Sequence, residues 1–584
     1  MAPVSEAGPH LDPAPPVHSP APDRRRSGLA AVAAVAGGAA LITVHAALYG
    51  NWIMDDAAIT FAYSRSLAEG NGPILQPGAP PVEGYSNPTW MALLALGRLV
   101  GLFDHGTLFG IPDYVFFPKA LALLCVIGVL TFCYFGAKAV TNRPRLVTFA
   151  AGAALAANPS FVIWCFSGLE NPFYALAVVA IAVTMVRAAV TDRLLTWQVA
   201  VSTGVWAALA ALTRPDGAIY AGAYPILVLL FVTRAKFGAS LRAGLLSVAA
   251  FLLPFGAYLL FRWFEFGRIV PNTAVAKAQP VPEFTDLGKV VEVIQYAGWM
   301  LVVLLVGCLA MVMARPSRLR TGMIAALVPL GLAVVAFCVL DADWMGEYRF
   351  ATPIWVLTAF VGSVVVVEAM SAARIRGRVL LAAVLVLGAA FSVNQFYGQA
   401  TAYTNAVKTP MCVVAERDGR TVNGMADVLG LRDGSVGVID LGGMSLTSRL
   451  RVVDLAGLGN AQTADYLHDN DRPGLRDHIF NEVKPSFITF IGTWDTNLGF
   501  TGDPVFARDY EPVFHSQWAG PPAPMIVNSY NYVGYWVRKD LVPGPAKLQE
   551  LKDYTTARVV PILEANRTAP RRTCGPVLER GQTG

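Results

Sequence analysis

Residues 51–88 read NWIMDDAAITFAYSRSLAEGNGPILQPGAPPVEGYSNP and follow directly on the first long apolar run of the chain. This stretch opens with two adjacent carboxylates, Asp55 and Asp56, on a helix-like segment, and a loop rich in Gly and Pro closes it. Carboxylates held at the edge of a membrane's hydrocarbon region are energetically costly, so they point to a function. From the residues alone, a solvated pair that caps the next helix is an equally good interpretation.

The composition predicts an integral membrane protein. Of the 584 residues, 55% are apolar and only 15% are charged. Apolar runs longer than about 18 residues recur, and each is long enough to cross a bilayer core of roughly 30 Å. The chain has no basic domain, RNP motif or zinc-spaced Cys/His set, so the sequence excludes a nucleic-acid-binding protein of these classes.

Eleven segments are predicted to cross the membrane. They are residues 29–50, 115–138, 146–163, 172–190, 196–212, 217–233, 243–263, 291–313, 321–340, 350–372 and 378–396. Basic and acidic connections alternate between them, and because Lys and Arg favour cytoplasmic loops, the acidic loops are expected outside. The N-terminus is then inside and the C-terminus outside. A further apolar segment, 89–103, would invert this alternation if it crossed, so we expect it to lie in the membrane interface.

The chain is predicted to divide into four regions. These are a disordered cytoplasmic N-terminus (1–28), a polytopic α-helical membrane domain (29–397), an external soluble α/β or α+β domain (398–566) and a flexible tail (567–584). The N-terminal region is rich in Pro and lacks an apolar core, and the run after it is typical of an uncleaved signal-anchor. The strand-like runs GSVGVIDL, RVVDLAGL, PSFITFIG and YVGYWVRK indicate the soluble domain.

Two of the seven cysteines, Cys412 and Cys574, lie in the predicted external domain. An exported domain with two cysteines is expected to join them in a disulfide. Spacing in the sequence does not establish that two thiols are near each other, so a free pair fits the sequence equally well. The other five cysteines lie in or near predicted spans and are expected to be packing residues.

An acid at an external membrane face suits group transfer from a lipid-linked donor. The Asp would accept the proton of an attacking hydroxyl, and the departing phosphate would need cations on the same face. The candidates for the donor phosphate or sugar are Arg65, Glu170, Arg214, Lys277 and Arg349, and those for the acceptor are Tyr85, Asp343 and Trp344. Ion pairs, snorkelling lysines, helix starts and interfacial aromatic belts explain the same residues structurally.

The helix that carries the acidic pair is expected to lie along the membrane surface. Ile59, Tyr63 and Leu67 recur at i, i+4 and i+8 and form one apolar stripe. Arg65 and Glu69 are spaced for an i,i+4 ion pair on another face of the same helix. Such a helix would hold Asp55 and Asp56 at the mouth of the helix bundle.

The ordered motifs resemble those of the GT-C glycosyltransferases, in particular the terminal arabinofuranosyltransferases of the actinobacterial cell envelope. They are MDDAAITFAYSRSLAEGNGPILQPGAPPVEGYSNPTW, SGLENPF, LTRPDG, PNTAVAK, DWMGEYRFATP and VVDLAGLGN, and they cover most of the chain. The resemblance implies a GT-C-like membrane fold with interfacial helices in the first external loop. It also implies a polyprenyl-phosphate sugar donor and a cell-envelope glycan acceptor outside a bacterial plasma membrane.

The resemblance further implies that an Asp of the first external loop is the general base. Family members often have the first residue of the pair in this role, which favours Asp55 over Asp56. The external domain resembles a carbohydrate-binding or acceptor-positioning module, the chain is expected to be a monomer, no metal ligand is assigned, and a divalent metal stays open. The alternatives are a mannosyl- or other hexosyltransferase, a lipid-linked sugar transporter, and a glycan-binding scaffold with a degenerate site.

Overall fold

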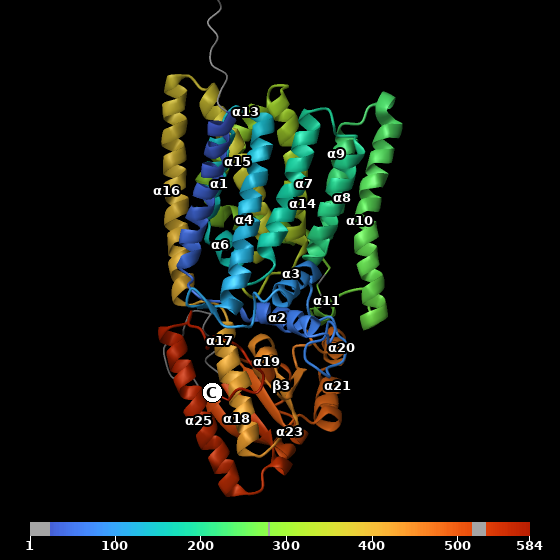
Figure 1. Cartoon of the computed structure of the whole chain (residues 1–584), viewed down its shortest axis with the longest axis vertical. Coiled ribbons are helices and arrows are strands. Elements are labelled where there is room, and N and C mark those ends of the chain that lie inside the picture. Colours follow the sequence, from blue (N-terminus) through green and yellow to red (C-terminus); the bar gives the residue numbers. More distant parts are fainter. Residues whose placement is uncertain (1–23, 278, 280, 517–532, 584) are drawn as a thin grey trace, which may run out of the picture.

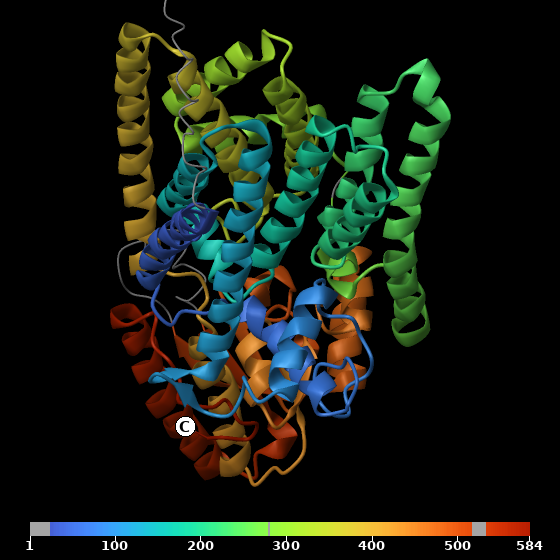
Figure 2. The same ribbon diagram turned by 45° about the horizontal axis from the view of Figure 1, so that its top comes forward.

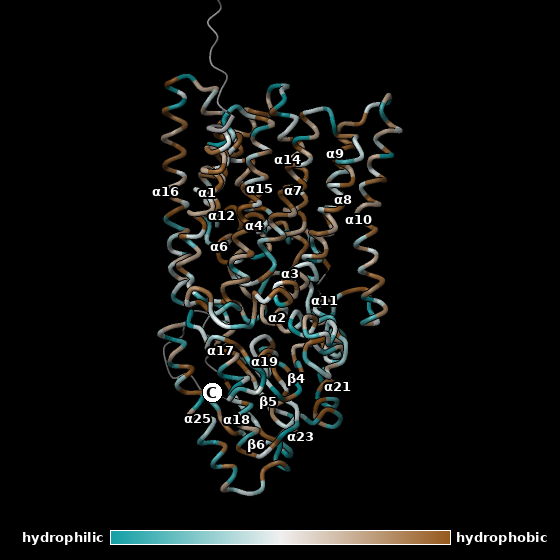
Figure 3. The backbone as a smooth tube through the Cα atoms, in the orientation of Figure 1, coloured by the Kyte–Doolittle hydropathy of each residue, from teal (hydrophilic) through white to brown (hydrophobic). Residues whose placement is uncertain are grey.

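The protein consists of a helical bundle with a mixed α/β domain at one end (Figure 1). The computed structural model describes residues 24–277, 279, 281–516 and 533–583. The bundle is predominantly apolar along its length, whereas polar segments are frequent in the domain below it (Figure 3). The disorder predicted for residues 1–23 lies outside the described residues, while residues 24–28 belong to the first helix and not to a disordered segment.

In the part of the chain that the structure describes, seven helices are long and apolar enough to span a membrane. They are α1 (Arg24–Ala47), α4 (Asp113–Val140), α7 (Asn171–Val190), α10 (Phe237–Phe266), α14 (Arg318–Val339), α15 (Thr352–Ala372) and α16 (Ile375–Asn405). Two more predicted spans are bent pairs, α5 (Pro144–Ala157) with α6 (Pro159–Cys165) at 84° and α12 (Lys289–Ala297) with α13 (Trp299–Met313) at 102°. The remaining two are shorter, namely α8 (Trp197–Ala211) and η1 (Pro215–Gly222) with α9 (Ala223–Leu230).

Both bends have a local cause in the sequence. Pro159 disfavours helical geometry at Asn158, where α5 ends, and the Asn158 side chain then accepts the N–H of Phe161 to cap α6. Between α12 and α13, Gly298 adopts φ 92°, which a residue with a side chain rarely adopts. The predicted spans 146–163 and 291–313 are therefore helical but not straight.

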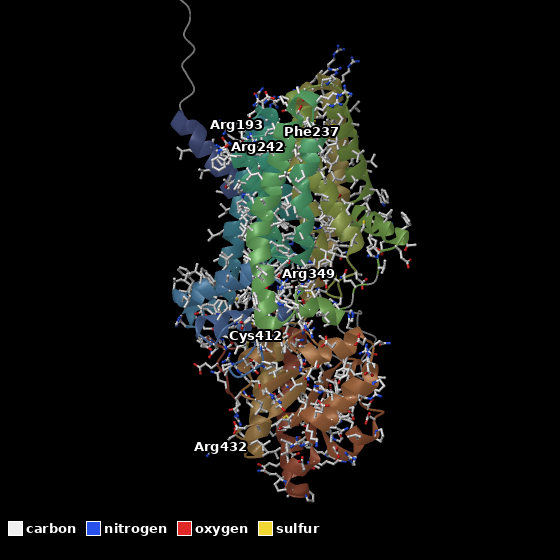
Figure 4. The ribbon with its side chains drawn as sticks, turned by 90° about the vertical axis from the view of Figure 1, so that its right-hand side faces the viewer. Arg193, Phe237, Arg242, Arg349, Cys412 and Arg432 are labelled. Atoms are coloured by element: carbon white, nitrogen blue, oxygen red, sulfur yellow. A yellow bond between two sulfur atoms is a disulfide. The ribbon has the colours of Figure 1, made fainter. Side chains whose placement is uncertain are left out.

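The basic connections gather at the end of the bundle that points away from the α/β domain (Figure 1). Figure 4 shows Arg193 and Arg242 at that end, whereas Arg349 and Cys412 lie toward the junction with the domain. The short η2 (Arg234–Lys236) precedes α10 in one of these connections. The alternation of charge expected from the sequence therefore corresponds to the two ends of the bundle.

The first long loop carries two helices at the domain end of the bundle, α2 (Asp55–Ala68) and α3 (Pro88–Leu99), followed by a small hairpin of β1 (Thr107–Leu108) and β2 (Ile111–Pro112). The twelve residues of α3 extend about 18 Å, too short to cross a bilayer. Figure 2 shows α2 and α3 against the C-terminal domain. Because α2 is buried on most sides, it does not lie with one face on the membrane surface as predicted. Three short helices complete this end: α11 (Asn272–Lys277), η3 (Phe284–Gly288) and η4 (Arg349–Ala351).

The C-terminal domain contains a five-stranded sheet in the order β4-β3-β5-β7-β6. The strands β3 (Ser435–Val438), β4 (Arg451–Asp454) and β5 (Phe487–Ile491) are parallel, and β7 (Val533–Arg538) and β6 (Tyr510–Ser516) continue antiparallel. The four strand-like runs of the sequence are confirmed as β3, β4, β5 and β7. Every residue of β5 is buried because helices cover both faces of the sheet.

The domain's helices are short except the last. They are α17 (Met411–Val414), η5 (Ala415–Arg420), α18 (Thr421–Val428), α19 (Gly442–Thr447), α20 (Ala461–His468), α21 (Arg472–Asp477), η6 (His478–Val483), α22 (Trp494–Asn497), α23 (Pro504–Asp509), η7 (Lys539–Leu541) and α25 (Pro545–Thr568). After α25 a disulfide joins Cys574 to Cys412, with Cα atoms 5.3 Å apart. Leu578 is 1% exposed, so the tail that was expected to be flexible packs into the fold.

Candidate active site

A cavity of about 690 Å³ lies between the domain end of the bundle and the C-terminal domain. The bundle side contributes the start of α2, the end of α11 and the loop before η4. The domain side contributes the segments that follow β3, β4 and β5, including Asp440, Ala456 and Thr493. In an open α/β sheet, ligands bind outside the carboxyl ends of the parallel strands where the strand order reverses. Here that crevice opens onto the acidic pair of α2.

Asp56 is the half-buried carboxylate of the pair, and it lines the cavity. Burial raises the pKa of Asp56. The positive charges of Lys277 and Arg349 partly oppose this shift, and the negative charges of Asp343 and Glu170 reinforce it. The side chain forms no hydrogen bond with any residue that the structure describes. Asp56 is therefore available to a ligand and faces two cations.

Asp55 has a different environment, although it also borders the cavity. It is 2% exposed, and its two carboxylate oxygens accept backbone N–H groups of Gly442 at 3.0 Å and Gly443 at 2.7 Å. Burial, and next the neighbouring Asp440, raise the pKa of Asp55. The sequence favoured Asp55 as the base, whereas the structure gives this carboxylate to the N-terminus of α19.

Lys277 reaches the cavity because α11 is fastened to the C-terminal domain. Asn272, at the start of α11, is 2% exposed and its amide donates to the carbonyls of Gly457 at 2.7 Å, Leu458 at 3.1 Å and Asn460 at 3.2 Å. Asp454 shapes that loop by accepting the N–H groups of the residues at 456 and 459. The PNTAVAK and VVDLAGLGN motifs thus contact each other.

Arg349 lies beside the same cavity and lines a second one of about 550 Å³ that adjoins it. Its guanidinium pairs with Asp343 at 2.8 Å and lies 5.0 Å from the centre of the Phe350 ring. Asp343 and Phe350 border both cavities. Arg349 therefore sits between the two hollows with one carboxylate partner, in agreement with the ion pair that the sequence allowed.

Glu170 and Arg214 form a buried pair behind this arrangement and do not line the cavity. Arg214 bonds Glu170 and Asp216, each at 2.9 Å, and the Asn87 amide donates to the other oxygen of Glu170. Burial by itself would raise the pKa of Glu170. The charges of Arg214 and Arg349 and the Asn87 hydrogen bond outweigh burial and hold this pKa below its ordinary value. The expected direct contact of this pair with the donor is not what the structure shows.

Two further predicted site residues lie away from the cavity. Arg65 does not pair with Glu69; it bonds Asp104 at 2.9 Å and donates to the carbonyls of Leu446 and Leu578, so it joins the first loop to the C-terminal region. Tyr85 is 2% exposed and packs edge-on against Tyr63. Both side chains make contacts inside the protein, and neither lines this cavity.

The wall of the cavity that the C-terminal domain forms contains residues that sequence reasoning missed. Trp344, which was predicted, is 51% exposed on one wall. Asp440, Arg472 and Trp494 lie on the wall formed by the C-terminal domain. Burial raises the pKa of Asp440 to about 6, although Arg417 at 2.9 Å opposes this. The sequence did contain a signal for Asp440 and Trp494, because they follow the predicted strands β3 and β5. Ligands commonly bind at the carboxyl ends of parallel strands.

A metal site is not evident in this arrangement. Among residues 24–277, 279, 281–516 and 533–583, no three His, Cys, Asp or Glu side chains are placed to hold a metal ion together.

Solved structures with related folds identify the architecture. ArnT from Cupriavidus metallidurans bound to undecaprenyl phosphate superimposes with a TM-score of 0.53 at 13% identity, covering 90% of this chain and 100% of that one. The mycobacterial arabinofuranosyltransferase AftD gives a TM-score of 0.50 at 14% identity, covering 88% of this chain and 40% of that one. The chain has the GT-C fold. The polytopic α-helical fold class with a C-terminal α/β domain, predicted from the sequence, is therefore confirmed.

Curated relatives share the sequence as well as the GT-C fold. A terminal β-(1→2)-arabinofuranosyltransferase of Mycobacterium tuberculosis is 29% identical over 325 residues, which are 51% of this chain and 49% of the relative. The enzyme of the same name from Corynebacterium glutamicum is 27% identical over 252 residues, 39% and 33% of the two chains. The chain thus matches half or less of the length of these relatives. No protein-family model matches it.

We predict that Asn272 is needed to hold α11 on the C-terminal domain. Asn272→Ala leaves one buried and two partly buried carbonyls without this donor, so the midpoint of thermal unfolding should fall by the equivalent of about 1–3 kcal/mol. The midpoint should fall further in Asn272→Asp, because a carboxylate would then face those carbonyls. Amide hydrogen exchange at residues 456–460 should rise in both variants. The exposed Asn481→Ala is the control, and equal stability of all three variants would contradict the assignment.

Proposed function

We propose that this chain is a membrane glycosyltransferase that transfers a sugar, arabinofuranose in the first instance, from a polyprenyl-phosphate donor to a glycan outside the cytoplasm. The observation that carries the proposal is the cavity in which Asp56 faces Lys277, with Arg349 alongside. A base and cations on one side of a hollow suit a reaction that removes a proton and releases a phosphate. The undecaprenyl phosphate held by ArnT and the arabinofuranosyltransferase relatives support this class of donor and sugar.

In the proposed reaction the acceptor hydroxyl oxygen bonds to the anomeric carbon of the donor sugar. The bond between that carbon and the phosphate oxygen breaks, and its electron pair leaves with the polyprenyl phosphate. Asp56 takes the hydroxyl proton. Lys277 and Arg349 stabilise the negative charge that grows on the phosphate, and Asp343 keeps Arg349 in place.

We place the donor lipid on the bundle side and the acceptor glycan on the side of the C-terminal domain. The second cavity, between α12, α14, α16 and the loop that leads into η4, joins the first at Asp343 and Phe350, and we take it as the path from the membrane. The opposite wall presents Trp494 and Arg472, an aromatic ring and a guanidinium that suit a sugar. The basic connections at the far end of the bundle support a cytoplasmic location for that end of a bacterial plasma membrane protein.

Asp56→Asn should lower kcat by roughly 10²–10⁴-fold because the amide cannot accept the proton. The assay measures transfer to a synthetic arabinan from polyprenyl-phosphoryl arabinofuranose, with the mannosyl donor as the alternative substrate. Asp55→Asn should instead lower the thermal unfolding midpoint, since it replaces an acceptor of the Gly442 and Gly443 N–H groups by a donor. If Asp56→Asn keeps full activity while folded Asp55→Asn has none, Asp55 is the base and the assignment is wrong.

In a plot of kcat against pH, replacing Lys277 by Ala should move the acid limb to higher pH. Burial raises the pKa of Asp56, and Lys277 is the main charge that lowers it again. Without this cation the pKa rises further, so Asp56 stays protonated, and inactive as a base, up to a higher pH. Lys277→Ala is compared with Lys277→Arg, which keeps the charge and should keep the wild-type limb. An acid limb that moves to lower pH in Lys277→Ala would contradict the arrangement.

Trp494→Ala should raise KM for the acceptor by about 3- to 10-fold, the loss expected for one aromatic contact, and leave KM for the donor unchanged. The measurement is initial rate against acceptor concentration at saturating donor. Trp197→Ala is a matched control because Trp197 is 64% exposed on α8, away from the cavity. An effect on donor KM alone would place the donor, and not the acceptor, on this wall.

A further inference from the structure

A second polar hollow lies at the end of the bundle opposite the active site. It has a volume of about 620 Å³ and is formed by α4, α7, α8, α14 and the connection between α7 and α8. Lys138, Arg187, Arg193 and Arg318 line it, and no acidic residue does. Figure 4 shows Arg193 at this end, far from Arg349. Four cations from four separate parts of the chain therefore surround one hollow.

The described residues do not neutralise these four cations. None of the four forms an ion pair with a residue that the structure describes. The nearest acids at this end are Asp192, which precedes Arg193 but does not line the hollow, and Glu368, which accepts the hydroxyl of Thr141. Like charges around one space repel each other, so an anion bound there would be stabilised by all four.

The other walls suit a group that is polar at one end and apolar at the other. Thr184, Gln198 and Ser202 offer hydrogen-bond donors, and Phe135, Ala139, Ala188 and Val199 are apolar. Lys138 and Arg187 occupy the last turns of α4 and α7, and Arg318 opens α14. Because these helices are long enough to cross the bilayer, the hollow lies at the level of the lipid phosphates.

Positive charge in cytoplasmic loops has a general cause, which is membrane orientation, and that cause explains the remaining basic connections. Arg374, which precedes α16, and Arg376 and Arg378 in its first turn illustrate it. None of them lines the hollow, and Arg378 donates to the carbonyl of Met370 near the end of α15. The hollow differs because its cations converge on one open pocket that also has an apolar wall.

We propose that this basic hollow binds the headgroup of an anionic phospholipid. The lipid phosphate accepts hydrogen bonds from the arginines, and the acyl chains leave along the apolar wall into the bilayer. Basic pockets between transmembrane helices on the cytoplasmic side are suited to such headgroups. The site is separate from the transfer reaction and stands whether or not the chain is a glycosyltransferase.

The test compares two triple variants of the full chain in detergent, each of which removes three arginines from the same end. Arg187→Ala with Arg193→Ala and Arg318→Ala should weaken the binding of fluorescent short-chain phosphatidylglycerol by roughly 100-fold. Arg374→Ala with Arg376→Ala and Arg378→Ala should leave it nearly unchanged. The single variant Arg193→Ala should lose part of the phosphatidylglycerol affinity. Because Arg193 lies in a connection and not in a span, this variant is the test if the triple variant does not fold.

Equal weakening by the two triple variants would show general charge attraction and overturn the proposal, as would no weakening by either. Phosphatidylcholine of the same chain length should bind weakly to all proteins, and equal binding of the two lipids would overturn a phosphate-specific anionic site. Inorganic phosphate should compete only poorly. If it displaces phosphatidylglycerol completely and binds as tightly, the hollow serves a soluble phosphate compound and the lipid assignment is wrong.

Discussion

Asp55 accepts backbone N–H groups from Gly442 and Gly443, which follow it by 387 and 388 residues in the chain. Hydrogen bonds to a charged group contribute about 1.5–3 kcal/mol each, and a buried carboxylate without them would be strongly destabilising. The contact requires glycines, because a Cβ at Gly442 would collide with the Asp55 backbone and one at Gly443 with the backbone around Met411 and Ala415. The position of the C-terminal domain on the first loop depends on this contact.

The contact that orients the Asp55 side chain also determines the direction of the Asp56 side chain. Successive side chains on a helix point about 100° apart, so when Asp55 faces α19, Asp56 must face elsewhere. The direction left to it is the cavity. The same docking brings the carboxyl ends of β3 and β5 over that cavity, and through Asn272 it also holds α11 and Lys277 there. The C-terminal domain is therefore a wall of the site rather than a separate module.

The sequence predicted the helices and strands that have a periodic apolar pattern. It did not predict contacts between residues that are far apart in the chain. Apolar runs located the spans, and alternation of apolar residues located β3, β4, β5 and β7. The strand β6 was missed because Pro512 and a register irregularity before Phe514 interrupt its pattern at the edge of the sheet. The partners of Arg65 were not visible in the sequence because they are an acid 39 residues away and carbonyls 381 and 513 residues away.

For the same reason, the sequence had no means to choose between Asp55 and Asp56. The two residues are adjacent, have the same chemistry and lie on the same helix. Only the glycine pair of α19, which no local pattern connects to them, makes one carboxylate structural and leaves the other available. The Asn272 amide and the loop at 457–460 were likewise visible as two motifs, but not as a contact.

The cations at the two ends of the bundle differ in what neutralises them. At the active end, Arg214 has Glu170 and Asp216, Arg262 has Glu83 and Arg349 has Asp343, because buried charges in a low-dielectric environment need partners. The free positive charge that faces the cavity is consequently small and is opposed by Asp55, Asp56 and Asp440. Such a site favours an anion of low charge, as in a phosphodiester-linked sugar, and repels polyanions. The hollow at the other end has no carboxylate in its walls, so an anion there meets attraction without that opposition. One chain thus keeps two anion environments apart, one selective through its own acids and one that attracts through uncompensated charge.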